Sequence, residues 1–455
     1  MFIDEKNEIE TDISNSEDDT ATNDRTENEL APKNNDLNSQ KKLFWLVSIG
    51  NNSSQLILLN FFQYFAAEVG VSQFVMGFLT AIRNLVTALF QGQIGLLSDK
   101  KGRKLFLLVG FFAAFSFTTL LIFSYNAIML ILVATAQAFA FSIIIPVWNA
   151  TLGDVTNIKG RTSFIGKLSS IGQGVGIVFM LILAVVFFLI NHFTGWIIWG
   201  VKIEELHWKV QYGIVFGVCA LGFLLAAISL IFFKETTKID GKASPRMRTA
   251  FQNKDFRFFI IINSIFGITM AALWPIYPVI QVKILDMKMY ELVIVATVYA
   301  ILFSFGGFLG GRVGDRFGRK PVLLFSRLIM FSVSLIYIPA VLTGSWIYVI
   351  LTNVVSGFGN GVFAVMMNAY ALDLSSEETL GAYSGLTQAS WGIATFIGSF
   401  GAGIISQFLV NAYGNNTMII ATTIGIAVLR VLASIGYFFI KESLPEDNKV
   451  HKNDY

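Results

Sequence analysis

The stretch GLLSDKKGRK, residues 95–104, separates two long apolar runs with a short segment that carries one acid and four basic residues. Residues 311–320, GRVGDRFGRK, repeat almost the same pattern, and their acids, Asp99 and Asp315, are 216 positions apart. A second pair of similar segments, NATLGD at 149–154 and NAYALD at 368–373, is 219 positions apart. Two repeats at nearly the same spacing indicate that the chain consists of two halves with the same internal order.

The composition limits the class of protein. Of the 455 residues, 54% are hydrophobic and 14% are charged, against roughly 25% charged residues in soluble domains. A soluble protein of this size could not bury so much apolar surface, so the chain is predicted to be an integral membrane protein. The one cysteine, Cys219, excludes an internal disulfide, and the three histidines lie in polar connections or in the tail. We therefore expect no metal site and no cofactor.

Apolar runs long enough to cross a membrane recur along the chain. A crossing helix needs about 20 mainly apolar residues. The sequence has twelve such runs, at residues 42–67, 72–97, 105–125, 127–150, 164–190, 211–233, 257–281, 291–312, 321–343, 345–371, 380–410 and 417–440. The predicted fold is therefore all-α, with twelve transmembrane helices in two pseudo-symmetric six-helix bundles.

Polar segments define the predicted boundaries of these bundles. Residues 234–256 are polar and contain Gly241 and Pro245, which makes them the natural linker between the bundles 41–233 and 257–440. Residues 1–40 carry a net charge of −9 and few apolar side chains, so they are predicted to be a disordered cytoplasmic tail. A short cytoplasmic tail, 441–455, ends the chain.

The repeated loop matches a known sequence pattern. Its consensus, G-x-L-[AGS]-D-[KR]-x-G-R-[KR], resembles the signature that joins helices 2 and 3 in the major facilitator superfamily of transporters. Residues 42–440 also fit the twelve-helix plan of that family. The positions that the resemblance assigns to gating are Gly95, Asp99, Lys100, Gly102, Arg103, Lys104, Gly311, Asp315, Arg316, Gly318, Arg319 and Lys320.

The resemblance implies a rocker-switch carrier with a central cavity between its two halves. In such carriers the motif's acid and arginine hold helix 2 against helix 11 while the cytoplasmic side is shut. Asp99 is therefore expected to pair with Arg103 and with the helix start that follows SSEE, residues 375–378. Asp315 is expected to act in the same way near Thr162 and Ser163.

Polar side chains within the apolar runs indicate where a solute would bind. At 100° per residue, Arg83 shares one stripe of its helix with Thr80, Asn84, Thr87 and Gln91, so it faces protein or water. An arginine in a membrane is costly and marks a candidate functional site. The predicted substrate-binding residues are Gln55, Asn60, Arg83, Gln137, Gln173, Trp274, Asn360, Gln388 and Trp391. Arg430 lies on a helix expected to be peripheral, and a structural role is expected for it.

Several functions remain open at this point. The leading hypothesis is transport of a polar organic anion or neutral solute by alternating access; the alternatives are efflux of amphipathic compounds and a non-transporting sensor. A membrane enzyme is disfavoured because the spans lack paired acids, His or a catalytic Cys site. Proton coupling is disfavoured because no predicted span has an Asp or Glu in its middle, where proton-carrying acids usually lie. Glu68, near the outer mouth, is the remaining candidate for such a role. The expected partners are a small-molecule substrate and the lipid bilayer, with no nucleic acid, and the protein is expected to be a monomer.

The distribution of basic residues gives the first testable prediction. With both termini cytoplasmic, inner loops and helix ends hold 22 Lys and Arg residues outside the tails, and outer loops hold four. Positively charged loops stay on the cytoplasmic side, so the chain is predicted to lie in the plasma membrane with both ends inside. A protease-sensitive reporter fused after Tyr455 should be protected in intact cells. Cleavage of that reporter from outside would reverse the orientation.

Overall fold

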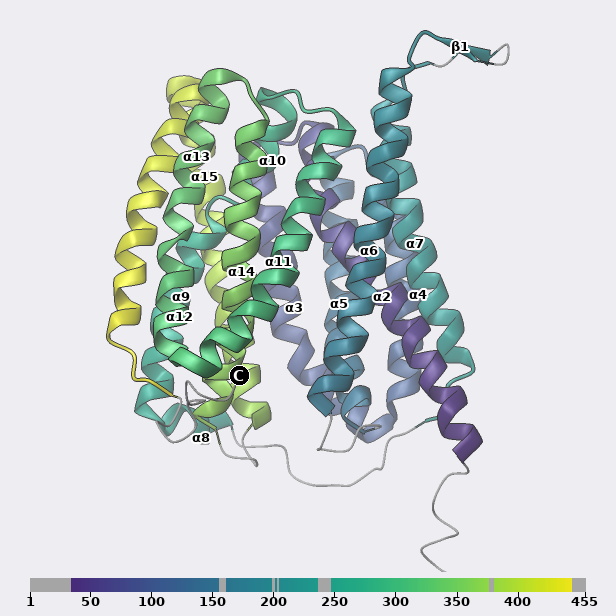
Figure 1. Cartoon of the computed structure of the whole chain (residues 1–455), viewed down its shortest axis with the longest axis vertical. Coiled ribbons are helices and arrows are strands. Elements are labelled where there is room, and N and C mark those ends of the chain that lie inside the picture. Colours follow the sequence, from purple (N-terminus) through teal and green to yellow (C-terminus); the bar gives the residue numbers. More distant parts are fainter. Residues whose placement is uncertain are drawn as a thin grey trace, which may run out of the picture.

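The computed structural model covers the whole chain and describes residues 34–154, 161–198, 201–202, 204–235, 247–375 and 380–443. Almost all of them are helical (Figure 1). The N-terminal half contains α2 (Asn34–Val69), α3 (Gln73–Lys101), α4 (Arg103–Leu121), α5 (Ala127–Asp154), α6 (Arg161–His192) and α7 (Trp208–Ile231). A small antiparallel hairpin, β1 (Ile197–Ile198) and β2 (Val201–Lys202), lies between α6 and α7.

The C-terminal half has the same order of crossings with more interruptions. It contains α8 (Met247–Gln252), α9 (Lys254–Ala271), α10 (Ile276–Val279), the π-helical turn η1 (Ile280–Ile284), α11 (Met289–Phe317), α12 (Arg319–Leu328), α13 (Met330–Thr343), α14 (Ile347–Asp373), α15 (Leu380–Ile435) and η2 (Gly436–Phe438). Gly414, with φ 82° and ψ 172°, divides α15 into two segments, which correspond to the last two predicted spans.

Ten helices of the described chain are long and apolar enough to cross a membrane, with α15 counted once. The remaining predicted span is α2, whose apolar run is interrupted by Asn51, Asn52, Gln55, Asn60 and Gln63. The all-α fold class and the two six-helix halves predicted from the sequence are confirmed.

Three local features of the structure differ in detail from the sequence prediction. Helix α2 begins at Asn34, so the end of the tail predicted to be disordered is helical and extends the first crossing. Helix α8 lies inside the stretch predicted to be a linker. The seventh crossing, predicted as one helix, is broken after α9, because Pro275 and Pro278 lack the backbone N–H that a continuous helix requires.

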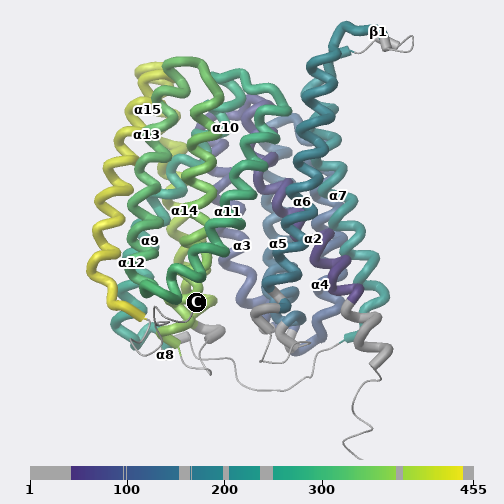
Figure 2. Tube along the Cα trace, in the orientation of Figure 1, coloured from purple at the N-terminus to yellow at the C-terminus, as the bar shows by residue number. Residues whose placement is uncertain are grey.

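The two halves meet along pairs of helices that are distant in the sequence. Figure 2 shows the N-terminal half in purple, blue and teal beside the C-terminal half, which is mainly green to yellow. Helix α3 packs against α15, and α6 packs against α11. We call the end of the bundle that carries the two repeated loops the motif end, and the other end the opposite end.

Contacts between the halves close the opposite end. The Gln73 backbone N–H donates to Gln407 Oε1 at 3.1 Å, and the Lys283 ammonium donates to the Glu68 carbonyl at 3.2 Å. Aromatic rings add further contacts, including Phe74 with Phe400 at a centroid distance of 5.9 Å. The halves are therefore joined at this end by hydrogen bonds and by apolar packing.

Glycine permits the closest approach in this closed end. A Cβ atom on Gly77 of α3 would lie 2.6 Å from the Ser399 carbonyl oxygen and 2.7 Å from Cα of Gly403 on α15. Both contacts are to backbone, which cannot move aside as a flexible side chain can. Closure of the opposite end therefore requires a residue without a side chain at Gly77.

We predict that Gly77→Ala shifts the protein away from the conformation described here. Overpacking costs about 1–3 kcal/mol, which corresponds to a population change of roughly 5- to 150-fold. A cysteine placed at Ser384, in the cavity described below, should react more slowly with a thiol reagent added at the motif end. The control is Gly92→Ala on the same helix, where a Cβ meets nothing within 4 Å. Equal reactivity in both variants would show that closure does not depend on this contact.

Candidate functional site

A cavity of about 1010 Å³ lies between the two halves. It extends from Tyr64 and Gln281, near the closed opposite end, to Asn149, Asn368 and Ser384, near the motif end. The repeated segments NATLGD and NAYALD therefore each contribute their asparagine to the cavity wall. The predicted substrate-binding residues that line it are Gln55, Asn60, Arg83, Gln173, Trp274, Asn360, Gln388 and Trp391.

Gln137 is the exception and does not line this cavity. It is fully buried, and its Nε2 donates to Thr118 Oγ1 of α4 at 3.0 Å. Its amide thus joins two helices of the same half. The polarity of a side chain within an apolar run predicts that it is shielded from lipid, and both a cavity and a helix contact provide that shielding.

Arg83 is half-buried on the N-terminal wall. Its guanidinium carbon lies 4.3 Å from the centroid of the Phe62 ring, a cation–π contact within the same half. No acidic residue is present among the described residues that line the cavity. The wall around Arg83 is instead made of neutral polar groups such as Asn84, Thr87 and Gln91. Arg83 therefore gives this part of the cavity a positive charge that no described carboxylate in the lining balances.

The broken seventh crossing forms much of the C-terminal wall. Tyr277 stacks on Tyr337 of α13 with ring centroids 4.3 Å apart, and Gln281 Nε2 donates to Tyr337 Oη at 2.6 Å. Tyr277 Oη and Gln281 Oε1 have no hydrogen-bond partner among the described residues, and both side chains line the cavity. Sequence reasoning missed Gln281 and Tyr337. The sequence WPIYP, which breaks the helix beside them, was the available signal.

Trp391 of α15 is held against the same wall. Its ring lies 5.4 Å from the Phe363 ring, and Gly267 of α9 leaves room for its edge, since a Cβ there would be 3.2 Å from Trp391 Cε3 and Cζ3. The wall can therefore present a fixed aromatic surface to a bound solute.

Arg430 joins helices of the C-terminal half. Its Nη1 donates to the Met330 carbonyl at 3.0 Å and to Ser334 Oγ at 2.9 Å, and its Nη2 donates to the Met270 carbonyl at 3.1 Å. These bonds fit the structural role expected for it, although the residue also reaches the cavity wall. Arg327, a second fully buried arginine in this half, was not singled out by sequence reasoning.

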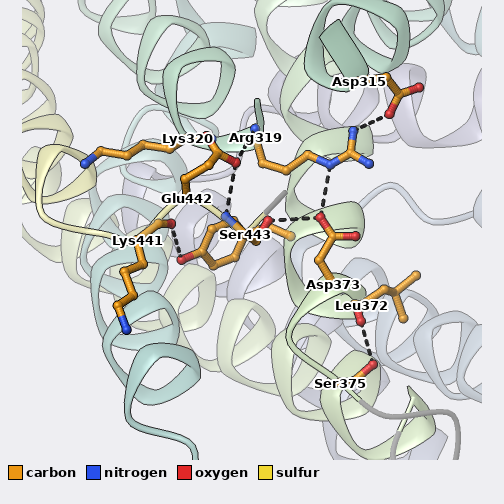
Figure 3. A network of polar contacts seen from close by, with 10 residues as sticks. Asp315, Arg319, Lys320, Leu372, Asp373, Ser375, Lys441, Glu442 and Ser443 are labelled. Atoms are coloured by element: carbon orange, nitrogen blue, oxygen red, sulfur yellow. Dashed lines mark hydrogen bonds and ion pairs between the residues drawn. The ribbon is translucent and has the colours of Figure 1, made fainter. Parts of the chain in front are cut away.

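At the motif end, the second repeated loop forms a polar network (Figure 3). Arg319 lies between two acids, with Nη1 2.6 Å from Asp315 Oδ1 and Nε 3.1 Å from Asp373 Oδ2. Ser443 Oγ also donates to Asp373, at 2.9 Å. All four residues belong to the C-terminal half, so the network ties together α11, α12, α14 and the segment after η2.

A glutamate that follows the last helix of each half caps the helix after each repeated loop. Glu442 accepts hydrogen bonds from the backbone N–H groups of Arg319 and Lys320 at 2.8 and 3.2 Å. Glu235 does the same for Arg103 and Lys104 at 3.1 and 3.0 Å. A carboxylate at a helix N-terminus satisfies free donors and interacts favourably with the helix dipole. Sequence reasoning missed this pair, although FFKET at 232–236 and FFIKES at 438–443 are similar.

The gating contacts expected from the sequence involve residues on both sides of the motif end. The side chains of Asp99, Thr162 and Ser163, and residues 376–379, lie outside the described part of the chain. Asp315, predicted to act against the other half when the motif end is shut, here pairs with Arg319 of its own half. The latch therefore stays a prediction about the other conformation.

Comparison with known proteins gives consistent similarities. The sequence pattern of the Major Facilitator Superfamily matches residues 44–257 and 258–453. An uncharacterized MFS-type transporter of Methanocaldococcus jannaschii is 24% identical over 402 residues, which is 85% of this chain and 94% of that protein. Shorter matches of 113 to 143 residues to three other curated proteins span only 17–26% of those proteins.

Two solved structures share the fold. A bacterial homologue of the human lysosomal transporter Spinster, in an inward-facing and occupied conformation, superposes with a TM-score of 0.64 at 19% identity, over 89% of this chain and 96% of that one. The nucleoside transporter NupG, in a mutant form, superposes with a TM-score of 0.65 at 13% identity, over 89% of this chain and 100% of that one. At these identities the similarity concerns the fold.

We predict that Glu442→Gln destabilises the C-terminal half. The variant keeps the shape of the side chain but replaces charge-assisted acceptance of two N–H groups with neutral hydrogen bonds, a loss of about 0.5–2 kcal/mol. The unfolding midpoint in detergent should fall by roughly 1–6 °C. Glu205→Gln, at an exposed position of the α6–α7 connection, is the control and should leave the midpoint unchanged. If the two variants had the same unfolding midpoint, the Glu442 cap would not contribute to stability.

Proposed function

Because the chain belongs to the major facilitator superfamily, we propose that it carries a polar organic solute, with an anion as the leading class, across the plasma membrane by alternating access. The observation that supports an anion is the position of Arg83. Its guanidinium lies at the wall of a cavity that has no acid among its described lining residues. A carboxylate or phosphate on the solute would supply the missing partner.

The rest of the lining suits the body of such a solute. Amides on both walls, including Asn60, Gln173, Asn360 and Gln388, offer donors and acceptors for hydroxyl or carbonyl groups. Trp274 and Trp391 offer apolar ring surface. A few placed polar groups in a partly apolar pocket are typical of small-molecule sites.

The arrangement of the halves supports an inward-facing conformation, given the predicted orientation. Contacts join the halves at the opposite end, and the cavity reaches toward the motif end. In the alternative conformation the contacts around Gly77 would open, and the motif end would close over the cavity. We propose that Asp99 and Asp315 then bind across the halves, so that their contacts favour the closed motif end by their own free energy.

Two alternatives make different predictions. Efflux of amphipathic compounds would rely on the apolar lining, such as Phe141, Ile145 and Phe303, and would not need Arg83. A sensor would bind the solute without moving it. Flux measurements in proteoliposomes separate a carrier from a sensor, and competition by anionic against lipophilic cationic compounds separates the two transport classes.

We predict that Arg83→Gln keeps the fold and impairs transport of the anionic substrate. A hydrogen bond to a charged group is worth about 1.5–3 kcal/mol, so the substrate Kd should rise roughly 10- to 150-fold. Binding can be followed by the shift in unfolding midpoint with candidate anions, and uptake by flux into proteoliposomes. Arg257→Gln, an exposed arginine of α9, is the matched control and should transport normally. Unchanged affinity for every transported anion would contradict an anion site at Arg83.

A further inference from the structure

The core of the C-terminal half contains a buried arginine, Arg327, that has no role in the proposed transport mechanism. Arg327 of α12 is 0% exposed and is not part of the cavity wall. Its guanidinium carbon lies 3.1 Å from the centroid of the Phe363 ring and 4.7 Å from that of Phe266. The aromatic rings interact favourably with the charge, but they contain no oxygen that could accept its N–H groups.

The hydrogen-bonding groups of Arg327 are unsatisfied within the described chain. Its Nε, Nη1 and Nη2 have no hydrogen-bond partner there, and the same is true of Nε of Arg430. All four atoms are donors, and both groups keep their positive charge because arginine does not lose its proton in proteins. A buried cation without a counter-charge is costly, and buried unpaired donors add to that cost.

Arg327 and Arg430 lie close together in the same group of helices. Arg327 contacts Phe266, whereas Arg430 donates to the carbonyl of Met270, one helical turn further along α9. Arg430 also donates to the carbonyl of Met330, three residues after Arg327. The two guanidinium groups therefore place two positive charges in the same part of the C-terminal core.

The other half shows that the fold does not require cations in these places. The offset of 216 between Asp99 and Asp315 relates Arg327 to Phe111, and the offset of 207 between Glu235 and Glu442 relates Arg430 to Phe223. Both phenylalanines are 0% exposed and belong to the apolar core of the N-terminal half. Apolar side chains therefore fill the corresponding positions of the other half. The fold alone does not account for the two buried arginines, so they need a chemical explanation.

We propose that Arg327 and Arg430 bind a small monovalent inorganic anion, of the size of chloride, in the core of the C-terminal half. An anion satisfies the unpaired donors and neutralises part of the charge together, which no neutral acceptor can do. The full burial of Arg327 between aromatic rings favours a compact ion over a polyatomic organic acid. Arg430 also borders the central cavity, whereas Arg327 does not line it and Arg83 lies on the wall of the other half.

The test follows the stability of the purified full-length protein as chloride or bromide replaces gluconate at constant ionic strength. For the wild type, the unfolding midpoint should rise by roughly 2–5 °C for each tenfold increase in halide above its Kd. Arg83→Gln should keep this response even where transport is lost, so the two proposals can fail independently. Arg327→Met should lose the response. In gluconate it should be more stable than the wild type, because it removes an uncompensated buried charge.

Two results would overturn the proposal. One is a wild-type midpoint that does not depend on halide, and the other is an equal halide response in Arg327→Met, which would indicate a general salt effect. If Arg327→Met does not fold, chloride-35 line broadening on the wild-type protein replaces it. Broadening that unlabelled bromide removes would support the site, and the absence of such broadening would exclude it.

Discussion

The hydrocarbon core of a membrane cannot solvate polar groups, and most of the arrangement described here follows from that constraint. Every amide, hydroxyl or charge within the crossings must face a cavity, a neighbouring helix or an ion. The cavity gathers the amides of α2 and α6, and Thr118 accepts from Gln137 inside one half. At the membrane boundary, glutamates satisfy the free N–H groups of α4 and α12. Polar residues thus specify which helix faces meet.

This constraint also explains how far the sequence could be interpreted. Helical periodicity and polarity were enough to place Arg83, Gln55 and Asn360 at the cavity, because a polar stripe on a crossing helix has few other destinations. The same reasoning failed for Gln137, because a contact between helices satisfies an amide as well as a cavity does. The break in the seventh crossing was signalled by Pro275 and Pro278, but proline can also kink a helix without ending it. Arg327 escaped notice because it lies close to the basic helix ends in sequence, although its side chain is in the core.

The two halves share some residues at equivalent positions and differ at others. Asn149 and Asn368 line the cavity from equivalent helix ends, and Glu235 and Glu442 cap equivalent helices. The buried cations are not repeated between the halves. The residue that corresponds to Arg83 at the offset of 216 is Tyr299, which also lines the cavity. The scaffold and its caps have therefore kept their symmetry, whereas the charges inside the membrane belong to one half or the other. Binding of an asymmetric solute is compatible with this division.

The position of the two capping glutamates has a consequence for what counts as a complete half. Each lies beyond the last crossing of its half, yet each bonds to the start of that half's third crossing. A half that ended with its sixth helix would lack this closure. Each structural unit therefore extends past its last crossing to include the segment FFKET or FFIKES.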